Sequence, residues 1–267
     1  MNTDKILAHL PGHPWRSHLR VFEEVESTNT LLKAMGREGA PEGTVLIADR
    51  QTGGRGRLGR TFLSPGGVGI YFSVLLRPNC PPAQLMHLTC AAAVAMCDAV
   101  EKCCGTRPQV KWINDLVLNR KKLGGILTEL NFDSKTGNVD FAVIGVGINC
   151  RQQAGDFDPA IRDLAISLEM GTREPVDRNT LAAEMIRAMH SLSRELLTGK
   201  ASVMARYKAD CLTLGKEIQV IRSGEIRPAY ALDLDCDGAL VVRYEDDGSV
   251  APVSSGEVSV RGMYGYV

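Results

Sequence analysis

The chain has 267 residues, of which 44% are hydrophobic and 23% charged, a composition typical of a packed globular protein. Its 31 basic and 31 acidic residues give a formal net charge of zero, which argues against a general nucleic-acid coat and an acidic solvating chain. The most apolar windows, near 68–76 and 139–148, span about ten residues, whereas a helix needs roughly 20 to cross a bilayer. With no transmembrane helix and no secretory signal expected, the composition predicts a soluble, cytoplasmic protein.

Cysteine and histidine spacing does not favour a metal centre. The eight cysteines include no Cys-x-x-Cys pair, and none lies at zinc-finger spacing from one of the five histidines. Cys90 and Cys97 lie among alanines and valines, where a free thiol packs as a small apolar side chain. His9 and His13 have helical spacing, but the prolines beside them would break that helix. We therefore expect structural thiols and no metal site built by the protein alone.

Alternating and continuous apolar runs predict five strands in the first 150 residues. They cover residues 45–49, 68–76, 110–118, 123–130 and 139–149. The connections at 119–122 and 133–138 are short and polar, as in hairpins. The last three strands are therefore expected to pair antiparallel.

Helical periodicity predicts two long helices. Pro82 opens the first, whose apolar surface ends at Gly105. The second starts near Thr180, with Asn179 or Thr180 as its N-cap, and carries a stripe of Leu and Met side chains toward the core.

The pattern changes after Gly215 to short strands separated by Gly-containing turns. These strands are expected at 217–222, 228–235, 240–244 and 258–261. A module of about 55 residues is too small to bury much surface alone, so it should lean on the larger part. The predicted fold is α+β: a mixed sheet packed with helices over residues 1–213, and a small β-barrel over 214–267.

Residues 50–97 contain no Asp or Glu, and 50–60 (RQTGGRGRLGR) hold four arginines and four glycines. The glycines match a dinucleotide fingerprint, but no helix follows them and the next acidic residue is Asp98, so that interpretation fails. Glycine amides approach a ligand closely, and guanidinium groups bind carboxylate or phosphate in a two-pronged geometry. The loop is expected to order over an anion. The alternative, an RNA-binding basic loop, lacks the extended basic patch that RNA binding requires.

A second polar cluster follows at 111–115 (KWIND) and 122–125 (KLGG). On one extended strand Lys111 and Asp115 would point to the same side, because side chains alternate with period two. Lysine offers a point charge for phosphate, whereas aspartate and asparagine bind magnesium or its waters. The two glycines leave room beside the strand for a flat ligand.

Several of these residues have simpler structural interpretations when taken alone. Ser27, Thr28 and Asn29 would form a helix cap before an apolar pair. Asn149 would be a turn residue at a strand end. Trp112 has apolar neighbours and is expected in the core.

Taken together, the motifs resemble the biotin protein ligase family. They stand in the family's order at 27–29 (STN), 51–57 (QTGGRGR), 111–115 (KWIND), 120–126 (RKKLGGI), 145–149 (GVGIN) and 256–261 (GEVSVR). Two departures are small: Ile113 stands where proline is common, and Phe62 where tryptophan is frequent. The resemblance implies a fold like that of class II synthetases and biotin ligases, with an SH3-like C-terminal barrel.

The resemblance also implies an activity. Such a ligase makes biotinyl-5′-AMP from biotin and ATP-Mg²⁺, then passes biotin to a lysine of the biotin carboxyl carrier domain of acetyl-CoA carboxylase or another biotin-dependent carboxylase. Carboxylate attack on the α-phosphate brings negative groups together, so cations must neutralise them. A lipoyl or octanoyl ligase of the same fold is the alternative enzyme, although the Gly-Arg-Gly-Arg loop favours biotin. A basic-loop nucleic-acid-binding module is the alternative without catalysis.

The resemblance assigns three sets of site residues. The catalytic set is Lys111, Arg57 and Lys122. The biotin-binding set is Ser27, Thr28, Asn29, Gln51, Gly54, Arg55, Gly56, Arg57, Lys122 and Gly125. The ATP-binding set is Arg57, Phe62, Lys111, Asn114, Asp115, Asn149 and Arg261. Magnesium is expected to come with ATP, near Asp115.

Only about 20 residues precede the family-like region, fewer than a helix-turn-helix module needs. We therefore expect a monofunctional ligase that does not bind specific DNA. The sequence leaves open whether it is a monomer or a homodimer.

Overall fold

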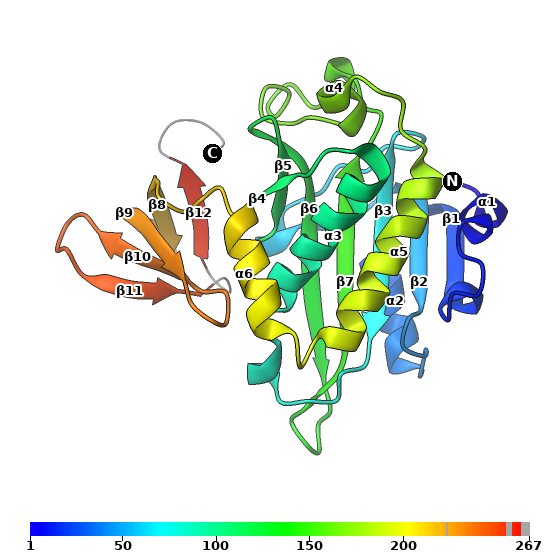
Figure 1. The fold of residues 1–267 in the computed structure, drawn as a ribbon, viewed down its shortest axis with the longest axis horizontal. Coiled ribbons are helices and arrows are strands. Elements are labelled where there is room, and N and C mark those ends of the chain that lie inside the picture. Colours follow the sequence, from blue (N-terminus) through cyan, green and yellow to red (C-terminus); the bar gives the residue numbers. More distant parts are fainter. Residues whose placement is uncertain (223, 255–257, 263–267) are drawn as a thin grey trace.

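The computed structural model describes residues 1–222 and 224–254, together with the backbone of 258–262. The strands of its larger sheet are β1 (Leu19–Val25), β2 (Val45–Gln51), β3 (Gly69–Leu76), β4 (Gln109–Lys111), β5 (Asp115–Leu118), β6 (Lys121–Phe132) and β7 (Val139–Asn149). Their order is β1-β2-β3-β7-β6-β5-β4 (Figure 1). β1 and β2 run parallel and the other pairs are antiparallel, which confirms the predicted mixed sheet.

Helices pack on both faces of this sheet. They are α1 (Thr3–Ala8), α2 (Thr28–Arg37), α3 (Leu88–Cys104), α4 (Leu168–Thr172), α5 (Arg178–Glu195) and α6 (Lys200–Asp210). α3, α5 and α6 lie together on one face, and α2 lies behind the sheet (Figure 1). The main apolar core fills the space under the three helices. A smaller cluster that includes Leu32, Leu75 and Phe141 lies under α2.

The first long helical region is apolar enough to differ from the expectation that no helix of this chain could cross a membrane. By length and composition, Pro82–Cys104 could cross a membrane, but 72% of its apolar window is buried inside the protein. Burial on nearly all sides explains this composition, since α3 lies between the sheet, α5 and α6. Pro82 opens a short 3₁₀ turn, and Gly105 ends α3 in a left-handed conformation, as predicted.

Two details of the predicted elements are wrong. The segment 110–118 is not one strand but the hairpin β4–β5, because a run rich in Val, Trp and Ile favours extended structure and no Gly or Pro marks its turn. The N-cap of α5 is Asp177, whose side chain accepts a hydrogen bond from the backbone N–H of Asn179. Strand β1, the short helices α1 and α4, and helix α6 were not expected.

The C-terminal part is a separate antiparallel sheet in the order β11-β10-β9-β8-β12. Its strands are β8 (Glu217–Arg222), β9 (Glu225–Leu234), β10 (Leu240–Tyr244), β11 (Val250–Val253) and β12 (Val258–Gly262). This confirms the all-β module, with β11 as an unexpected additional strand. The module lies beside α6 (Figure 1).

Candidate active site

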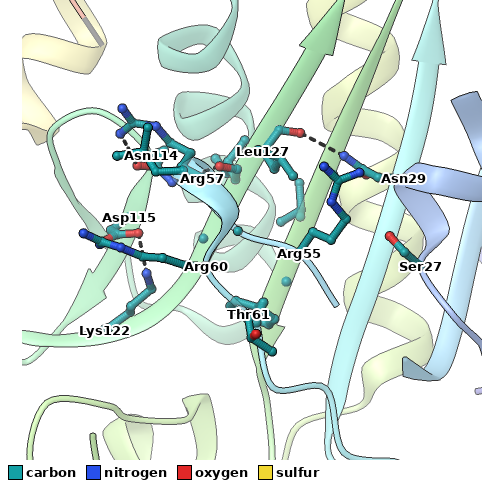
Figure 2. Close-up of a pocket in the computed structure, with 18 of the residues that line it drawn as sticks. Ser27, Asn29, Arg55, Arg57, Arg60, Thr61, Asn114, Asp115, Lys122 and Leu127 are labelled. Carbon is teal, nitrogen blue, oxygen red and sulfur yellow. Dashed lines mark hydrogen bonds and ion pairs between the residues drawn. The ribbon is translucent and has the colours of Figure 1, made fainter. Parts of the chain in front are cut away.

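A pocket opens on the α2 face of the sheet, beyond the N-terminal end of that helix. Its cavity volume is about 160 Å³, and it is open to solvent on one side. Its lining comes from the start of α2, the end of β2, the loop after it, β3, the β4–β5 hairpin, the first half of β6 and the middle of β7. In Figure 2, Ser27 and Asn29 lie on one side, and Asp115 and Lys122 lie on the other.

Strand register builds the floor of this pocket. One cross-strand row runs through Lys111, Asp115, Gly125, Gly147 and Tyr71. Residues opposite each other in a sheet point to the same face. The row therefore places a lysine and a carboxylate directly beside two glycines, whose missing side chains leave the floor open.

The glycines of β7 also admit neighbouring side chains. A Cβ at Gly145 would lie 2.1 Å from Oδ1 of Asn29, and one at Gly147 would lie 2.4 Å from the Phe62 ring. Both contacts are shorter than any side chain tolerates. Glycine is therefore required for Asn29 and Phe62 to lie against the sheet.

The side of the pocket near α2, called here the polar end, consists of Ser27, Thr28, Asn29 and Gln51. Ser27 caps α2, as predicted, by accepting a hydrogen bond from Thr30 N. Gln51 Oε1 accepts from Thr28 N at 2.9 Å, while Ser73 Oγ lies 2.7 Å from Thr28 Oγ1 and 2.6 Å from Asn29 Oδ1. These neutral groups fix one another's orientation.

Glu129 extends this network. Its carboxylate accepts from Asn29 Nδ2 at 3.1 Å and from Lys33 Nζ at 2.7 Å, and it lies 3.9 Å from Arg55 Nη1. Burial alone would raise the pKa of Glu129, but the hydrogen bonds from Lys33 and Asn29 and the charges of Lys33 and Arg55 hold it below its ordinary value. An ionised Glu129 fixes the amide of Asn29 with its nitrogen away from Ser73.

The opposite side, called here the cationic end, consists of Arg57, Lys111 and Lys122. Arg57 lies on a 3₁₀ turn of the basic loop and donates to Asn114 Oδ1 at 3.0 Å. Burial lowers the pKa of Arg57, and the nearby Asp115 charge opposes that effect. Lys122 Nζ donates to Asp115 Oδ1 at 2.6 Å.

The hairpin corrects the geometry predicted for Lys111 and Asp115. They were expected on one side of a single strand, but they are cross-strand partners in β4 and β5. Cross-strand partners share a face, so both still line the pocket. Lys111 is 9% exposed, so the residue is largely buried in the wall of the pocket.

Charge at the pocket is strongly one-sided. Five cationic side chains line it, and Asp115 is the one carboxylate among the lining residues that the structure describes: Arg55, Arg57, Arg60, Lys111 and Lys122 are the cations. A lining with this excess of positive charge stabilises an anion that carries phosphate or carboxylate groups.

The pocket does not fit a metal held by protein ligands alone. In the described ranges, no three His, Cys, Asp or Glu side chains gather to hold an ion. Magnesium prefers oxygen ligands and usually binds through substrate phosphates with one or two carboxylates. Asp115 lines the pocket, and its contact with a nucleotide-bound magnesium ion stays a prediction.

Most residues predicted for the site converge on this pocket. Those that line it are Ser27, Thr28, Asn29, Gln51, Arg55, Gly56, Arg57, Phe62, Lys111, Asn114, Asp115, Lys122 and Gly125. Gly54 does not line it. A Cβ there would meet Phe62 O at 2.3 Å, so Gly54 permits the close packing of the loop instead. The side chain of Arg261 lies outside the described residues.

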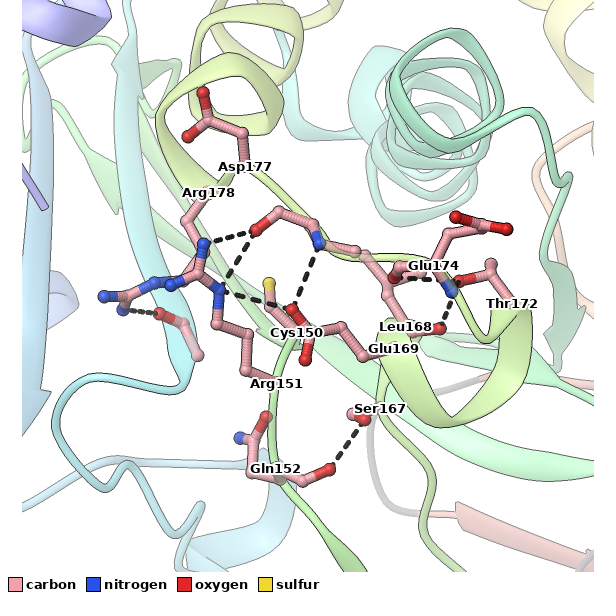
Figure 3. Close-up of polar contacts among 12 residues, drawn as sticks. Cys150, Arg151, Gln152, Ser167, Leu168, Glu169, Thr172, Glu174, Asp177 and Arg178 are labelled. Atoms are coloured by element: carbon pink, nitrogen blue, oxygen red, sulfur yellow. Dashed lines mark hydrogen bonds and ion pairs between the residues drawn. The ribbon is translucent and has the colours of Figure 1, made fainter.

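Asn149 also lies outside the pocket lining. Its side-chain nitrogen donates to Ile166 O at 3.2 Å, and its oxygen accepts from Gln152 Nε2 at 3.1 Å. Figure 3 shows the neighbouring polar contacts, in which Ser167 Oγ donates to Gln152 O and Arg151 pairs with Glu169. This network fixes the segment after β7, so contact of Asn149 with a nucleotide stays a prediction.

Sequence reasoning missed several residues at the site. Arg60, Phe72, Ile126, Leu127, Gly145 and Gly147 line the pocket, and Glu129 orients Asn29 from behind. The GVGIN motif contains two of these glycines, and their spacing of two along a strand could have indicated a bare face. Glu129 had no such signal, because its partners lie about a hundred residues away.

Comparison with known proteins gives one consistent result. Residues 21–149 match the biotin/lipoate A/B protein ligase family, and residues 213–261 match the biotin protein ligase C terminal domain. The bifunctional ligase/repressor BirA of Bacillus subtilis is 31% identical over 244 residues, covering 91% of this chain and 74% of that protein. The biotin--[acetyl-CoA-carboxylase] ligase of Mycobacterium tuberculosis is 33% identical over 253 residues, covering 92% and 90%.

Solved structures agree. The biotin protein ligase from Aquifex aeolicus in complex with biotin and ATP has a TM-score of 0.76 and 29% identity, covering 91% of this chain and 98% of that chain. The motifs, the fold and the matches at both ends of the chain point to the same conclusion. The chain belongs to the biotin/lipoate A/B protein ligase family, as a BirA-like biotin protein ligase.

Proposed function

We propose that this chain activates biotin with ATP and transfers it to a lysine of a biotin carboxyl carrier domain. In the first step a biotin carboxylate oxygen attacks the α-phosphorus, and pyrophosphate leaves. In the second, the lysine amine attacks the acyl carbon of biotinyl-5′-AMP, and AMP leaves. The relatives named as biotin ligases and the structure solved with biotin and ATP support this reaction.

One observation carries the proposal: a single pocket joins a neutral polar end to a cationic end. Biotin has a neutral ring system and an anionic carboxylate, so it matches both ends at once. Ser27, Thr28, Asn29 and Gln51 would bind the ring system by hydrogen bonds. The carboxylate would then point toward Lys122.

The cationic end would bind the triphosphate. Lys111 would stabilise the charge that develops on the α-phosphate, and Arg57 would neutralise the adenylate and help to retain it. Phe62 is proposed to stack near adenine, with Asn114 and Asp115 near the ribose-phosphate or its Mg²⁺. Asn149 and Arg261 remain proposed nucleotide contacts on family resemblance alone.

The remaining loop residues would act through the backbone. Gly54 allows the loop to pack tightly, and Gly56 and Gly125 leave space for the ligand beside Arg55. The loop is proposed to order further over the adenylate, since its arginines repel one another without an anion.

The experiment that tests this function is direct. The purified chain is incubated with biotin, ATP-Mg²⁺ and a biotin carboxyl carrier domain, and the intact mass of the carrier is measured. We expect one biotinyl group per carrier, and none when the target lysine is replaced by arginine. Labelling by lipoate or octanoate but not biotin would instead support the alternative ligase.

Three further properties belong to this proposal. We infer that the boundary between catalytic and C-terminal domains lies at 213/214, where helix α6 gives way to the antiparallel module. The enzyme would act in the cytoplasm. Its oligomeric state, monomer or homodimer, is read from its mass in solution. We also propose that the chain does not repress transcription, which its zero formal charge supports. A footprint on biotin-operon DNA at physiological salt would contradict this.

A further inference from the structure

The β4–β5 hairpin is held by hydrogen bonds from two buried aromatic side chains, Trp112 and Tyr207. The indole Nε1–H of Trp112 donates to Gly238 O at 2.9 Å, and the Trp112 backbone N–H donates to Thr213 Oγ1 at 2.9 Å. The hydroxyl of Tyr207 donates to Ile113 O at 3.0 Å. Trp112 is 4% exposed and Tyr207 is fully buried, so these bonds form away from competing water.

Gly238 belongs to the C-terminal module, in the turn between β9 and β10. Its φ is +88°, and a Cβ there would lie 2.7 Å from Cys90 Sγ on α3. Ion pairs join the same side of the module to α6: Lys200 with Asp237, and Lys208 with Asp233. The turn is therefore packed tightly against the catalytic domain at the point where it accepts the indole N–H.

The hairpin also lines the pocket. Lys111 immediately precedes Trp112, and Asn114 follows Ile113 and accepts from Arg57 of the basic loop at 3.0 Å. A continuous path of bonded groups thus runs from Gly238 through Trp112 to the residues of the cationic end. The hydrogen bonds described for the polar end run instead to α2, β2, β3 and the middle of β6, away from Trp112 and Gly238.

We propose that Trp112 and Tyr207 are positioning residues that hold Lys111 and Asn114 at the pocket, and that the hold through Trp112 exists only while the C-terminal module is docked. This inference rests on the proposed function and adds to it a route by which the module acts on nucleotide use. It assigns the module a role without requiring any of its side chains to touch the ligand. Loss of this route should lower kcat/KM for ATP and leave biotin binding unchanged.

The first test removes each donor and keeps an aromatic side chain. Trp112→Phe replaces the indole, with its N–H, by a smaller phenyl ring, and Tyr207→Phe deletes the hydroxyl alone. For both variants we expect kcat/KM for ATP in adenylate formation to fall about tenfold, the size of effect that the loss of a buried hydrogen bond produces. The Kd for biotin alone should change by less than about twofold, because its site lies outside the path.

Tyr207→Phe separates positioning from direct contact. Trp112 borders the pocket and could touch a ligand, whereas Tyr207 is not among the lining residues. The matched control is Trp15→Phe, which truncates the other buried tryptophan, beside His13 and His190. It should lower the melting temperature but leave kcat/KM for ATP and the Kd for biotin unchanged.

The second test displaces the module itself and has a readout besides activity. The chain has two tryptophans, so Trp112 is the sole tryptophan in a Trp15→Phe background and can be excited selectively at about 295 nm. Gly238→Ala would push the turn away from Cys90, and we expect the emission of Trp112 to shift to longer wavelength as the indole is exposed. Gly248→Ala is the control, because Gly248 also has positive φ, +69°, but no atom within 4 Å of its Cβ position.

The outcomes are distinguishable. The inference would be overturned if Tyr207→Phe lowered the affinity for biotin as much as it lowers kcat/KM for ATP. It would also be overturned if kcat/KM for ATP were unchanged in both aromatic variants. A Trp112 spectrum that is the same in Gly238→Ala and Gly248→Ala would overturn it as well. If the unaltered chain forms no adenylate, the proposed function fails, and the fluorescence comparison alone still decides whether the module holds the hairpin.

Discussion

Lys111 is the residue whose role the site geometry defines most narrowly. It is nearly buried, lies opposite Asp115 across the hairpin, and borders the open glycine floor. A cation that acts on charge developing in the transition state affects rate more than ground-state binding. We expect Lys111→Ala to slow adenylate formation by about 10²–10³-fold, the loss typical of one such donor.

The measurement is single-turnover formation of biotinyl-5′-AMP beside the Kd for biotin. Lys102→Ala is the control, because Lys102 is exposed on α3 and pairs with Glu184 far from the pocket. A fall in biotin affinity as large as the fall in rate would show that Lys111 binds biotin instead.

Arg57 is expected to retain the intermediate more than to form it. Its guanidinium is half-buried and repelled by Arg60 of the same loop, and the bond to Asn114 fixes it beside the hairpin. Arg57→Ala should release preformed adenylate at least about tenfold faster, since a charge-assisted contact is lost. Arg50→Ala, which removes an exposed partner of Glu24 outside the pocket, should leave the release rate unchanged. Equal release rates for Arg57→Ala and the unaltered chain would contradict this role.

Glu129 should make stability depend on pH. Because folding lowers its pKa below the ordinary 4.5, its ionised form stabilises the native state above that pH, and the contribution disappears as the pH falls through the lowered value. The melting temperature of Glu129→Gln should therefore lie below that of the unaltered chain at neutral pH, with the gap closing in acid. Glu24→Gln, which breaks an exposed pair with Arg50, should show little gap at any pH. A pH-independent gap for Glu129→Gln would exclude this titration.

At the scale of elements, β7 carries two glycines that serve different parts of the pocket. Gly145 makes room for Asn29 of the polar end, and Gly147 makes room for Phe62 of the loop. Gly145→Ala would displace Asn29, and Gly147→Ala would displace Phe62, by the overlaps that a Cβ creates. We expect the first to weaken biotin binding at least about tenfold and the second to raise KM for ATP, because each clash must be relieved by moving the neighbour. Gly155→Ala, which meets no atom within 4 Å, is the control. If both β7 variants weaken biotin binding and leave KM for ATP unchanged, Phe62 does not contact the nucleotide.

The hairpin shows where sequence reasoning about elements fails. Alternation gave the right face for Lys111 and Asp115, although the pair lies across two strands instead of along one. Period two could not reveal the reversal, because Trp112 and Ile113 are strand-favouring residues and the turn is fixed by distant groups, Tyr207 and Thr213. Turns marked by local chemistry were predicted, such as the left-handed pair Asn119 and Arg120 between β5 and β6.

At the scale of the whole molecule, the mixed sheet, the core helices and the C-terminal module follow from periodicity and composition. What periodicity could not supply is the packing between them. Strand β1 has no clean alternation of buried and exposed residues, and its pairing with β2 brings together residues 26 positions apart, such as Leu19 and Val45. The network around Asn29 and Glu129 likewise depends on tertiary contact.

The central claim, that one pocket joins biotin to ATP, is tested most directly by isotope exchange between ATP and pyrophosphate. Exchange requires reversible adenylate formation on the enzyme and needs no carrier domain. We predict exchange that depends on both biotin and Mg²⁺, that lipoate does not support, and that Lys111→Ala reduces by about 10²-fold or more. Exchange without biotin, or with lipoate in its place, would contradict the account.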